Sequence, residues 1–152
     1  MTRKQKKLIA GQVPSSKPLP SLGKVSEYKE CCFNWSLGSK YLWHKAGDKF
    51  CFCDVSADNL KKVVTKLNDF RSCSWRKMEQ HDECGGGSIP IYTLERDIQK
   101  MVQEHLKSCD LMNHDELFRV RIDSSHRVWG IRIGEVFHLI WNDEEHLFYK
   151  TR

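Results

Sequence analysis

The stretch LFRVRIDSSHRVWGIRIGEVFHLIWNDEEHLFYK, which runs from Leu117 to Lys150, decides the fold of this chain. Side chains alternate in character along residues 117–123 and 127–133, with the period of two that a β-strand with two unlike faces shows. Gly134 and Glu135 fit a two-residue hairpin turn of type II′, which has glycine at its first central position. The stretch therefore predicts a tightly turned antiparallel β-meander.

The meander is expected to continue past this turn. Residues 136–141 are mostly apolar, as in a central strand. Residues 142–145, Asn-Asp-Glu-Glu, form a polar turn that leads into a last strand at residues 146–149. Strands are also predicted earlier, at residues 28–35 and 49–54, and residues 41–44 are a candidate for a third.

Two helices are predicted between the early strands and the meander. Ser56 can cap the first, whose apolar positions recur at helical spacing: Leu60, Val63, Val64, Leu67 and Phe70. The second begins near Thr93, and its apolar stripe consists of Leu94, Ile98, Met101, Val102 and either His105 or Leu106. Residues 71–80 are expected to form a short helical turn with Trp75 and Met78 inward. This order predicts an α+β fold, in which two helices pack on one face of an antiparallel sheet that ends in the β-meander.

The chain has the size of one domain, at 152 residues. We expect residues 25–152 to form that domain and residues 1–24, rich in Pro, Gly, Ser and Lys, to be a flexible basic arm. Residues 1–26 contain six basic residues and no acidic ones, so the other 126 residues, with 19 basic and 20 acidic side chains, are close to neutral.

Membrane and metal functions are not expected. No apolar run approaches the roughly 18 residues that span a bilayer, so a cytoplasmic protein with no membrane contact is predicted. The seven cysteines are expected to be reduced, and Cys73, His81, Cys84 and His44 lack the paired spacing of a structural zinc site. Residues 85–88, Gly-Gly-Gly-Ser, are expected to form a loop rather than a phosphate cradle, because Ile-Pro-Ile follows instead of a helix.

Polar residues of the meander are the candidate site. The residues assigned to catalysis are Arg121, Arg127, His146 and Tyr149. Those assigned to RNA binding are Arg119, Arg132 and His138, together with Lys4, Lys6 and Lys7 of the arm. Strand alternation places Arg119 and Arg121 on one face, whereas Arg127 and Arg132 share a face only if a bulge or bend intervenes.

This set of residue types suits phosphodiester chemistry. Arginine binds phosphate oxygens bidentately and can stabilise the charge that grows during attack by a ribose 2′-hydroxyl. His146 can act as an acid or a base, Tyr149 can donate a proton or stack on a base, and Asp143 can hold the imidazole in one tautomer. The alternative is an ordinary wet face of a sheet, in which charged residues keep the protein soluble.

The sequence resembles the RelE/YoeB/ParE-like toxins of bacterial toxin–antitoxin modules. The likeness rests on Arg127-Val128-Trp129-Gly130-Ile131-Arg132 and the closing His146-Leu147-Phe148-Tyr149. It implies a compact α+β protein that cuts mRNA at the ribosome. It also implies that Arg121 or Arg127 binds the phosphate, and that His146 and Tyr149 match the family's C-terminal His and aromatic pair. The chain departs from the family in its length, its near-neutral folded part and the spacing of His146 and Tyr149.

Two functions are therefore expected as alternatives, and a metal-dependent hydrolase built on the Cys and His residues ranks behind both. The first is a toxin-like endoribonuclease that needs neither metal nor cofactor and acts on RNA or the ribosome, with a protein antitoxin or defence protein as its partner. The second is a non-catalytic binding module, a toxin–antitoxin or phage-defence partner, that uses the basic arm and the sheet to contact protein or nucleic acid.

Overall fold

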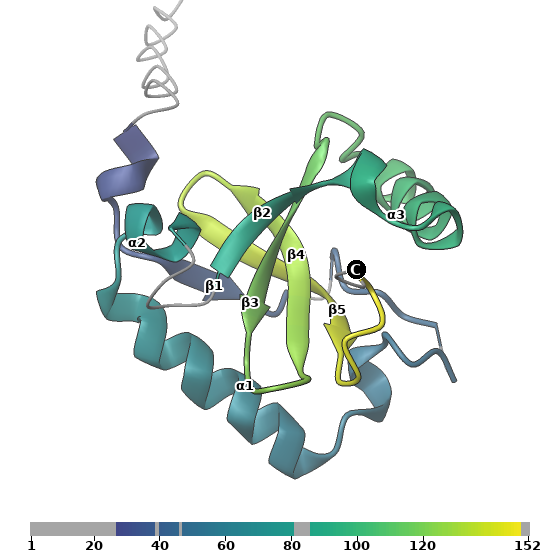
Figure 1. Cartoon of the computed structure of the whole chain (residues 1–152), viewed down its shortest axis with the longest axis horizontal. Coiled ribbons are helices and arrows are strands. Elements are labelled where there is room, and N and C mark those ends of the chain that lie inside the picture. Colours follow the sequence, from purple (N-terminus) through teal and green to yellow (C-terminus); the bar gives the residue numbers. More distant parts are fainter. Residues whose placement is uncertain (1–26, 39, 46, 81–85, 150–152) are drawn as a thin grey trace, which may run out of the picture.

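The computed structural model, shown in Figure 1, describes residues 27–38, 40–45, 47–80 and 86–149. It contains one five-stranded sheet in the order β1-β5-β4-β3-β2. The strands are β1 (Asn34–Ser36), β2 (Gly86–Pro90), β3 (Glu116–Arg121), β4 (Arg127–Ile133) and β5 (Val136–Asp143). β1 runs parallel to β5, and the other neighbours are antiparallel, so the sheet is mixed. The predicted α+β class is confirmed, and the predicted antiparallel sheet is mostly right, because β1 is the one strand of the described sheet that pairs in parallel.

Helices follow the predicted order. The α-helices are α1 (Ala57–Asp69), α2 (Trp75–Glu79) and α3 (Arg96–Ser108). The short 3₁₀ helices are η1 (Glu27–Glu30), η2 (Phe52–Asp54), η3 (Phe70–Ser72) and η4 (Ile91–Thr93). Ser56 caps α1 as predicted, because its side chain accepts a hydrogen bond from the backbone N–H of Asn59. Trp75 and Met78 of α2 are buried, also as predicted.

The two long helices cover opposite faces of the sheet (Figure 1). Val63 and Leu67 of α1 share a core with Phe118 and Val120 of β3. Val102 and Leu106 of α3 belong to a second core, which contains the alternate β3 residue Leu117. The prediction that both helices pack on one face is therefore wrong. A one-sided apolar stripe determines which side of a helix is buried, but not which face of the sheet it meets.

The early strands are largely replaced by loops. Only β1 forms within residues 28–35, residues 49–54 end in the 3₁₀ helix η2, and no strand forms at residues 41–44. Aromatic side chains in these segments still reach the core: Phe50 packs against Phe148, with ring centroids 5.2 Å apart. Their apolar composition thus reflects burial of individual side chains rather than pairing of the backbone.

Two further segments differ from the prediction. Gly86 and Gly87 belong to the edge strand β2, and Gly86 is packed so closely that an added Cβ would lie 2.7 Å from the carbonyl oxygen of Met78. Residues 146–149 form a turn instead of a strand, and they fold back over the sheet. That turn supplies two of the predicted catalytic residues.

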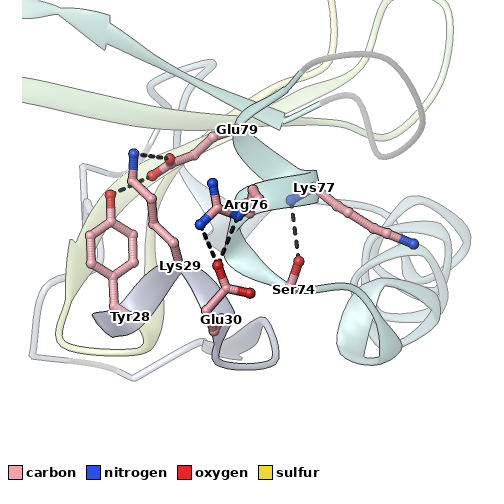
Figure 2. Close-up of polar contacts among 7 residues, drawn as sticks. All are labelled: Tyr28, Lys29, Glu30, Ser74, Arg76, Lys77 and Glu79. Carbon is pink, nitrogen blue, oxygen red and sulfur yellow. Dashed lines mark hydrogen bonds and ion pairs between the residues drawn. The ribbon is translucent and has the colours of Figure 1, made fainter. Parts of the chain in front are cut away.

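A polar clasp joins η1 to α2, as Figure 2 shows. The Tyr28 hydroxyl donates to Glu79 over 2.7 Å, and the Lys29 ammonium lies 3.6 Å from the same carboxylate. Arg76 donates to Glu30 in a second ion pair. The clasp holds the start of the described chain against the α1 and α2 side of the molecule.

Candidate functional site

Three strands place charged side chains side by side at one end of the sheet. Arg121 of β3 lies opposite Arg127 of β4, and Arg127 lies opposite Asp143 of β5. Residues directly opposite each other in an antiparallel pair have Cβ atoms about 4.5–5.5 Å apart. The three side chains therefore form one row across the sheet, on the face that α3 covers further along.

A second row, two residues along β3, is cationic and aromatic. Arg119 lies opposite Trp129, which lies opposite Trp141. The Arg119 guanidinium is 6.0 Å from the centroid of the Trp129 ring and 5.9 Å from that of Tyr149. Its position is thus fixed between two aromatic rings.

The C-terminal turn is folded onto this surface by Asp143. This carboxylate is 1% exposed and accepts backbone N–H bonds from Leu147 at 2.8 Å and from Phe148 at 2.9 Å. Phe148 then stacks on Trp129, with centroids 4.8 Å apart. The expectation that Asp143 holds the His146 imidazole is wrong, since both of its oxygens bind the backbone of the turn.

His146 is held close to the arginines. Its backbone has a φ of 55°, a left-handed conformation that is uncommon for residues other than glycine. Its Nε2 atom is buried and has no hydrogen-bond partner among the described residues. Burial lowers the pKa of His146, and the positive charge of Arg127 lowers it further, whereas Asp143 raises it. The imidazole is therefore neutral at physiological pH, and its buried Nε2 is unpaired among the described residues.

Arg127 is the most enclosed of the three arginines. It is 8% exposed, and its Nη1 donates to the carbonyl oxygens of Asp123, Ser124 and His126 in the β3–β4 turn. Burial lowers its pKa, and the charges of Arg121 and Arg119 lower it further. Arg127 thus braces the turn and also adds positive charge to the cluster.

The arginine charges lack direct counter-ions in the described part of the chain. The ion pairs within 4.0 Å there join Lys29 to Glu79 and Arg76 to Glu30, and none involves Arg119, Arg121 or Arg127. Burial lowers the pKa of Arg119 as well. Guanidinium groups keep their charge in proteins, so an anion that bound here would relieve the repulsion between them. We call Arg119, Arg121, Arg127, His146 and Tyr149 the arginine cluster.

Other predicted site residues lie elsewhere. Arg132 is on the opposite face, 3.5 Å from the centroid of the Tyr28 ring, and its Nη1 donates to the carbonyl oxygen of Gly134. No bulge in β4 brings Arg132 to the face of Arg127. The pairing of β4 with β5 is irregular between Trp129 and Gly130, but the extra residue there is Ile140 of β5. His138 shares the face of the cluster but lies near the start of β5, with its ring 5.2 Å from that of Tyr41. Lys4, Lys6 and Lys7 lie outside the described residues.

One polar pair escaped prediction. The His126 ring is 2% exposed, and its Nε2 lies 2.6 Å from the Asn142 side-chain oxygen. Asn142 in turn donates to Glu144. The sequence signal was the turn Asp123-Ser124-Ser125-His126, in which the Asp123 carboxylate accepts from the backbone N–H groups of Ser125 and His126. This pair joins the β3–β4 turn to the end of β5 behind the cluster.

The described residues contain neither a cluster of metal ligands nor a membrane-spanning helix. Among the described residues no group of three or more His, Cys, Asp or Glu side chains could hold a metal ion. His81 and Cys84 of the zinc candidates lie outside those residues. Within the described part of the chain, the helices are too short or too polar to cross a bilayer.

Comparison of the chain with protein-family models, curated proteins and solved structures finds no significant match.

Proposed function

We propose that this protein is a metal-independent endoribonuclease whose active site is the arginine cluster. The observation that carries the proposal is the meeting of three guanidinium groups with a histidine whose Nε2 has no hydrogen-bond partner among the described residues. A phosphodiester carries the negative charge that would pair with the three guanidinium groups, and it brings a ribose 2′-hydroxyl to the same place.

Arg119 and Arg121 are the arginines best placed to bind the phosphate. Arg119 makes ring contacts but no hydrogen bond with the described residues, and Arg121 is exposed and uses one donor on the carbonyl oxygen of Asp123. The Nη1 of Arg127 already donates hydrogen bonds to three carbonyl groups. It therefore acts mainly through its charge, which stabilises the transition state from the inner side of the site.

The proton steps follow from the state of His146. Its lowered pKa keeps the imidazole neutral, so it can take the proton from a ribose 2′-hydroxyl as that oxygen attacks phosphorus. The bond from phosphorus to the 5′-oxygen breaks, and the Tyr149 hydroxyl gives the leaving oxygen its proton. The products are a 2′,3′-cyclic phosphate and a free 5′-hydroxyl, and no metal takes part.

The substrate class follows from the resemblance to RelE/YoeB/ParE-like toxins and from the aromatic surface. Tyr149 and Trp129 flank Arg119, and an unpaired base could stack on Tyr149 beside the phosphate. We therefore propose mRNA as the substrate, met at the ribosome, and a protein antitoxin as the partner that restrains the enzyme.

The test is cleavage of a labelled single-stranded RNA by the purified full chain in EDTA. Wild-type protein is expected to yield fragments with 2′,3′-cyclic phosphate ends, and Arg121→Gln or His146→Gln to lower the rate by about 100-fold or more. Arg132→Gln is the matched control, because Arg132 lies on the other face. RNA that stays intact with the wild-type protein, both as free RNA in EDTA and on ribosomes in a magnesium buffer, would refute the proposal.

A non-catalytic binding module is the second candidate function. It is favoured by the charge distribution, because the basic excess lies in residues 1–26 while the rest of the chain is close to neutral. In this case the arginine cluster and the arm, including Lys4, Lys6 and Lys7, hold RNA without cutting it. Deletion of residues 1–24 would then weaken RNA binding and flatten its dependence on salt. Unchanged affinity and salt dependence would count against this function.

A further inference from the structure

A polar cavity of about 450 Å³ lies on the face of the sheet opposite the arginine cluster. Its walls come from η1, α2, the three strands β2, β3 and β4, and the loop before β3. Five side chains of its described lining carry a charge: Lys29, Glu79, Asp115, Glu116 and Arg132. None of them belongs to the arginine cluster, so the cavity is a separate site.

Two of these charges neutralise each other. The Lys29 ammonium lies 3.6 Å from the Glu79 carboxylate, which also accepts a hydrogen bond from the Tyr28 hydroxyl (Figure 2). His114 lines the cavity as well, but burial lowers its pKa and the charge of Arg132 lowers it further, whereas Asp115 raises it. The imidazole is therefore neutral at physiological pH. The charges that remain for a ligand are those of Arg132, Asp115 and Glu116.

Arg132 is held in place by aromatic contacts rather than by a carboxylate. Its guanidinium lies 3.5 Å from the centroid of the Tyr28 ring and 5.9 Å from that of Trp75. Nη1 donates to the carbonyl oxygen of Gly134, and no ion pair within 4.0 Å joins Arg132 to a described residue. Most N–H donors of the group thus stay available, in a fixed orientation that suits bidentate binding of a carboxylate.

The two remaining carboxylates stand on the wall next to Arg132. Phe118 pairs with Gly130 across β3 and β4, so Glu116 and Arg132, each two residues further along, point to the same face. Asp115 precedes Glu116, and both side chains are exposed. Neither forms an ion pair within 4.0 Å with a described residue. The cavity therefore has one seat for an anionic group and two seats for cationic groups.

We infer that this cavity binds a basic α-amino acid, such as arginine or lysine. The ligand carboxylate pairs with Arg132, and the α-ammonium and the side-chain cation pair with Asp115 and Glu116. Every unpaired charge of the described lining then meets an opposite charge. A polyamine would leave Arg132 facing a cation, a neutral amino acid would leave one carboxylate without a partner, and a nucleotide would set its phosphate against two carboxylates. The site is independent of the proposed nuclease activity.

The experiment is a nuclear magnetic resonance titration of the full chain with free L-arginine, up to about 50 mM, in a low-salt buffer at neutral pH. The guanidinium signals of Arg132 and the ring signals of Tyr28 are expected to shift and saturate. Agmatine lacks the carboxylate of arginine, and L-citrulline lacks its side-chain charge. Each should bind at least about tenfold more weakly than L-arginine, because each loses one charge-assisted contact.

Variants assign each contact of the ligand. Arg132→Gln should weaken binding of L-arginine about tenfold without weakening that of agmatine, whereas Glu116→Gln should weaken both. Arg121→Gln, on the opposite face, is the matched control and should change neither. Circular dichroism checks that each variant stays folded.

Three results would overturn the inference. One is the absence of saturable shifts with L-arginine in the wild-type protein. Another is agmatine or L-citrulline binding as tightly as L-arginine, a comparison that needs no variant. The third is an Arg132→Gln protein that loses affinity for L-arginine and agmatine equally, since Arg132 would then only shape the cavity.

Discussion

His146 shows how much of a site can depend on one residue. Its side chain was identifiable from sequence because a histidine near arginines suggests phosphate chemistry. Its left-handed backbone was not, because that conformation depends on the buried Asp143, whose carboxylate holds the N–H groups of Leu147 and Phe148. The shared face of Arg119 and Arg121 could be predicted from the sequence, because the alternation of side chains is a local property of one strand. The closeness of His146 to them depends on a turn that returns over the sheet.

The pH dependence of cleavage tests the environment of His146. The active form of the imidazole is neutral, and its pKa lies below the ordinary value of about 6.5. The rate should therefore stay level as pH falls from 8 to 7 and drop only below about 6.5. Arg121→Gln removes a positive neighbour, so the drop should move to higher pH, as measured by pH–rate profiles. A drop that stays in place or moves to lower pH would contradict this account of the lowered pKa.

Arg127 is expected to matter for folding more than Arg121 does. Arg127→Ala removes the three hydrogen bonds that its guanidinium donates to the carbonyl groups of the β3–β4 turn and should cost about 2–3 kcal/mol of unfolding free energy. Arg121 is exposed, and Arg121→Ala should cost less than about 1 kcal/mol. Urea denaturation of both variants measures the difference. Equal costs would show that Arg127 does not brace the turn.

At the scale of elements, the β4–β5 hairpin was the most predictable part of the fold. Its two-residue turn forms as expected, with Gly134 at a φ of 61°. The irregularity inside the hairpin was not predicted. Pairing jumps from Trp129–Trp141 to Gly130–Leu139, and the extra residue Ile140 joins the α3 side of the core. Alternation within one strand cannot reveal such a jump, because it depends on how the partner strand curves.

Two glycine variants of this hairpin should differ in stability. A Cβ at Gly130 would lie 1.9 Å from the carbonyl oxygen of His138, so Gly130→Ala must distort the backbone and should cost more than about 3 kcal/mol. Nothing lies within 4 Å of a Cβ at Gly134, so Gly134→Ala meets only the strain of a positive φ, about 1–2 kcal/mol. Thermal and urea denaturation should rank the variants in this order. A Gly130→Ala protein as stable as Gly134→Ala would contradict the close approach.

For the whole molecule, the order of elements followed from the sequence but their layering did not. Each helix showed its apolar stripe, and α1 and α3 then took opposite faces because strands β3 and β4 are apolar on both sides. Phe118 and Leu117 are neighbours in the chain, yet they belong to different cores. The helices α1 and α3 cover the two faces of the sheet but leave one end of it open. At that end, Arg121, Arg127 and Asp143 take the place of apolar residues. The arginine cluster lies at that end.

Stability of the whole protein should fall as pH drops below about 6.5. Burial lowers the pKa of four histidines: His105, His114, His138 and His146. In the unfolded chain they regain the ordinary value, so between the two pKa values the unfolded state binds more protons. Their contribution is therefore complete above about pH 7 and is lost progressively in acid. Urea midpoints at pH 7.5 and 5.5 measure it, and equal midpoints would contradict the lowered pKa values.

The proposed function requires one phosphate site that unites Arg119, Arg121, His146 and Tyr149. Nuclear magnetic resonance can test it by titrating the protein with a single-stranded oligonucleotide made uncleavable by 2′-deoxy substitution. The guanidinium signals of Arg119 and Arg121 and the ring signals of His146 and Tyr149 should shift together and saturate at one ligand concentration, while those of Arg132 and His138 stay in place. Shifts confined to Arg132 and His138, or no shift at the arginine cluster, would contradict it.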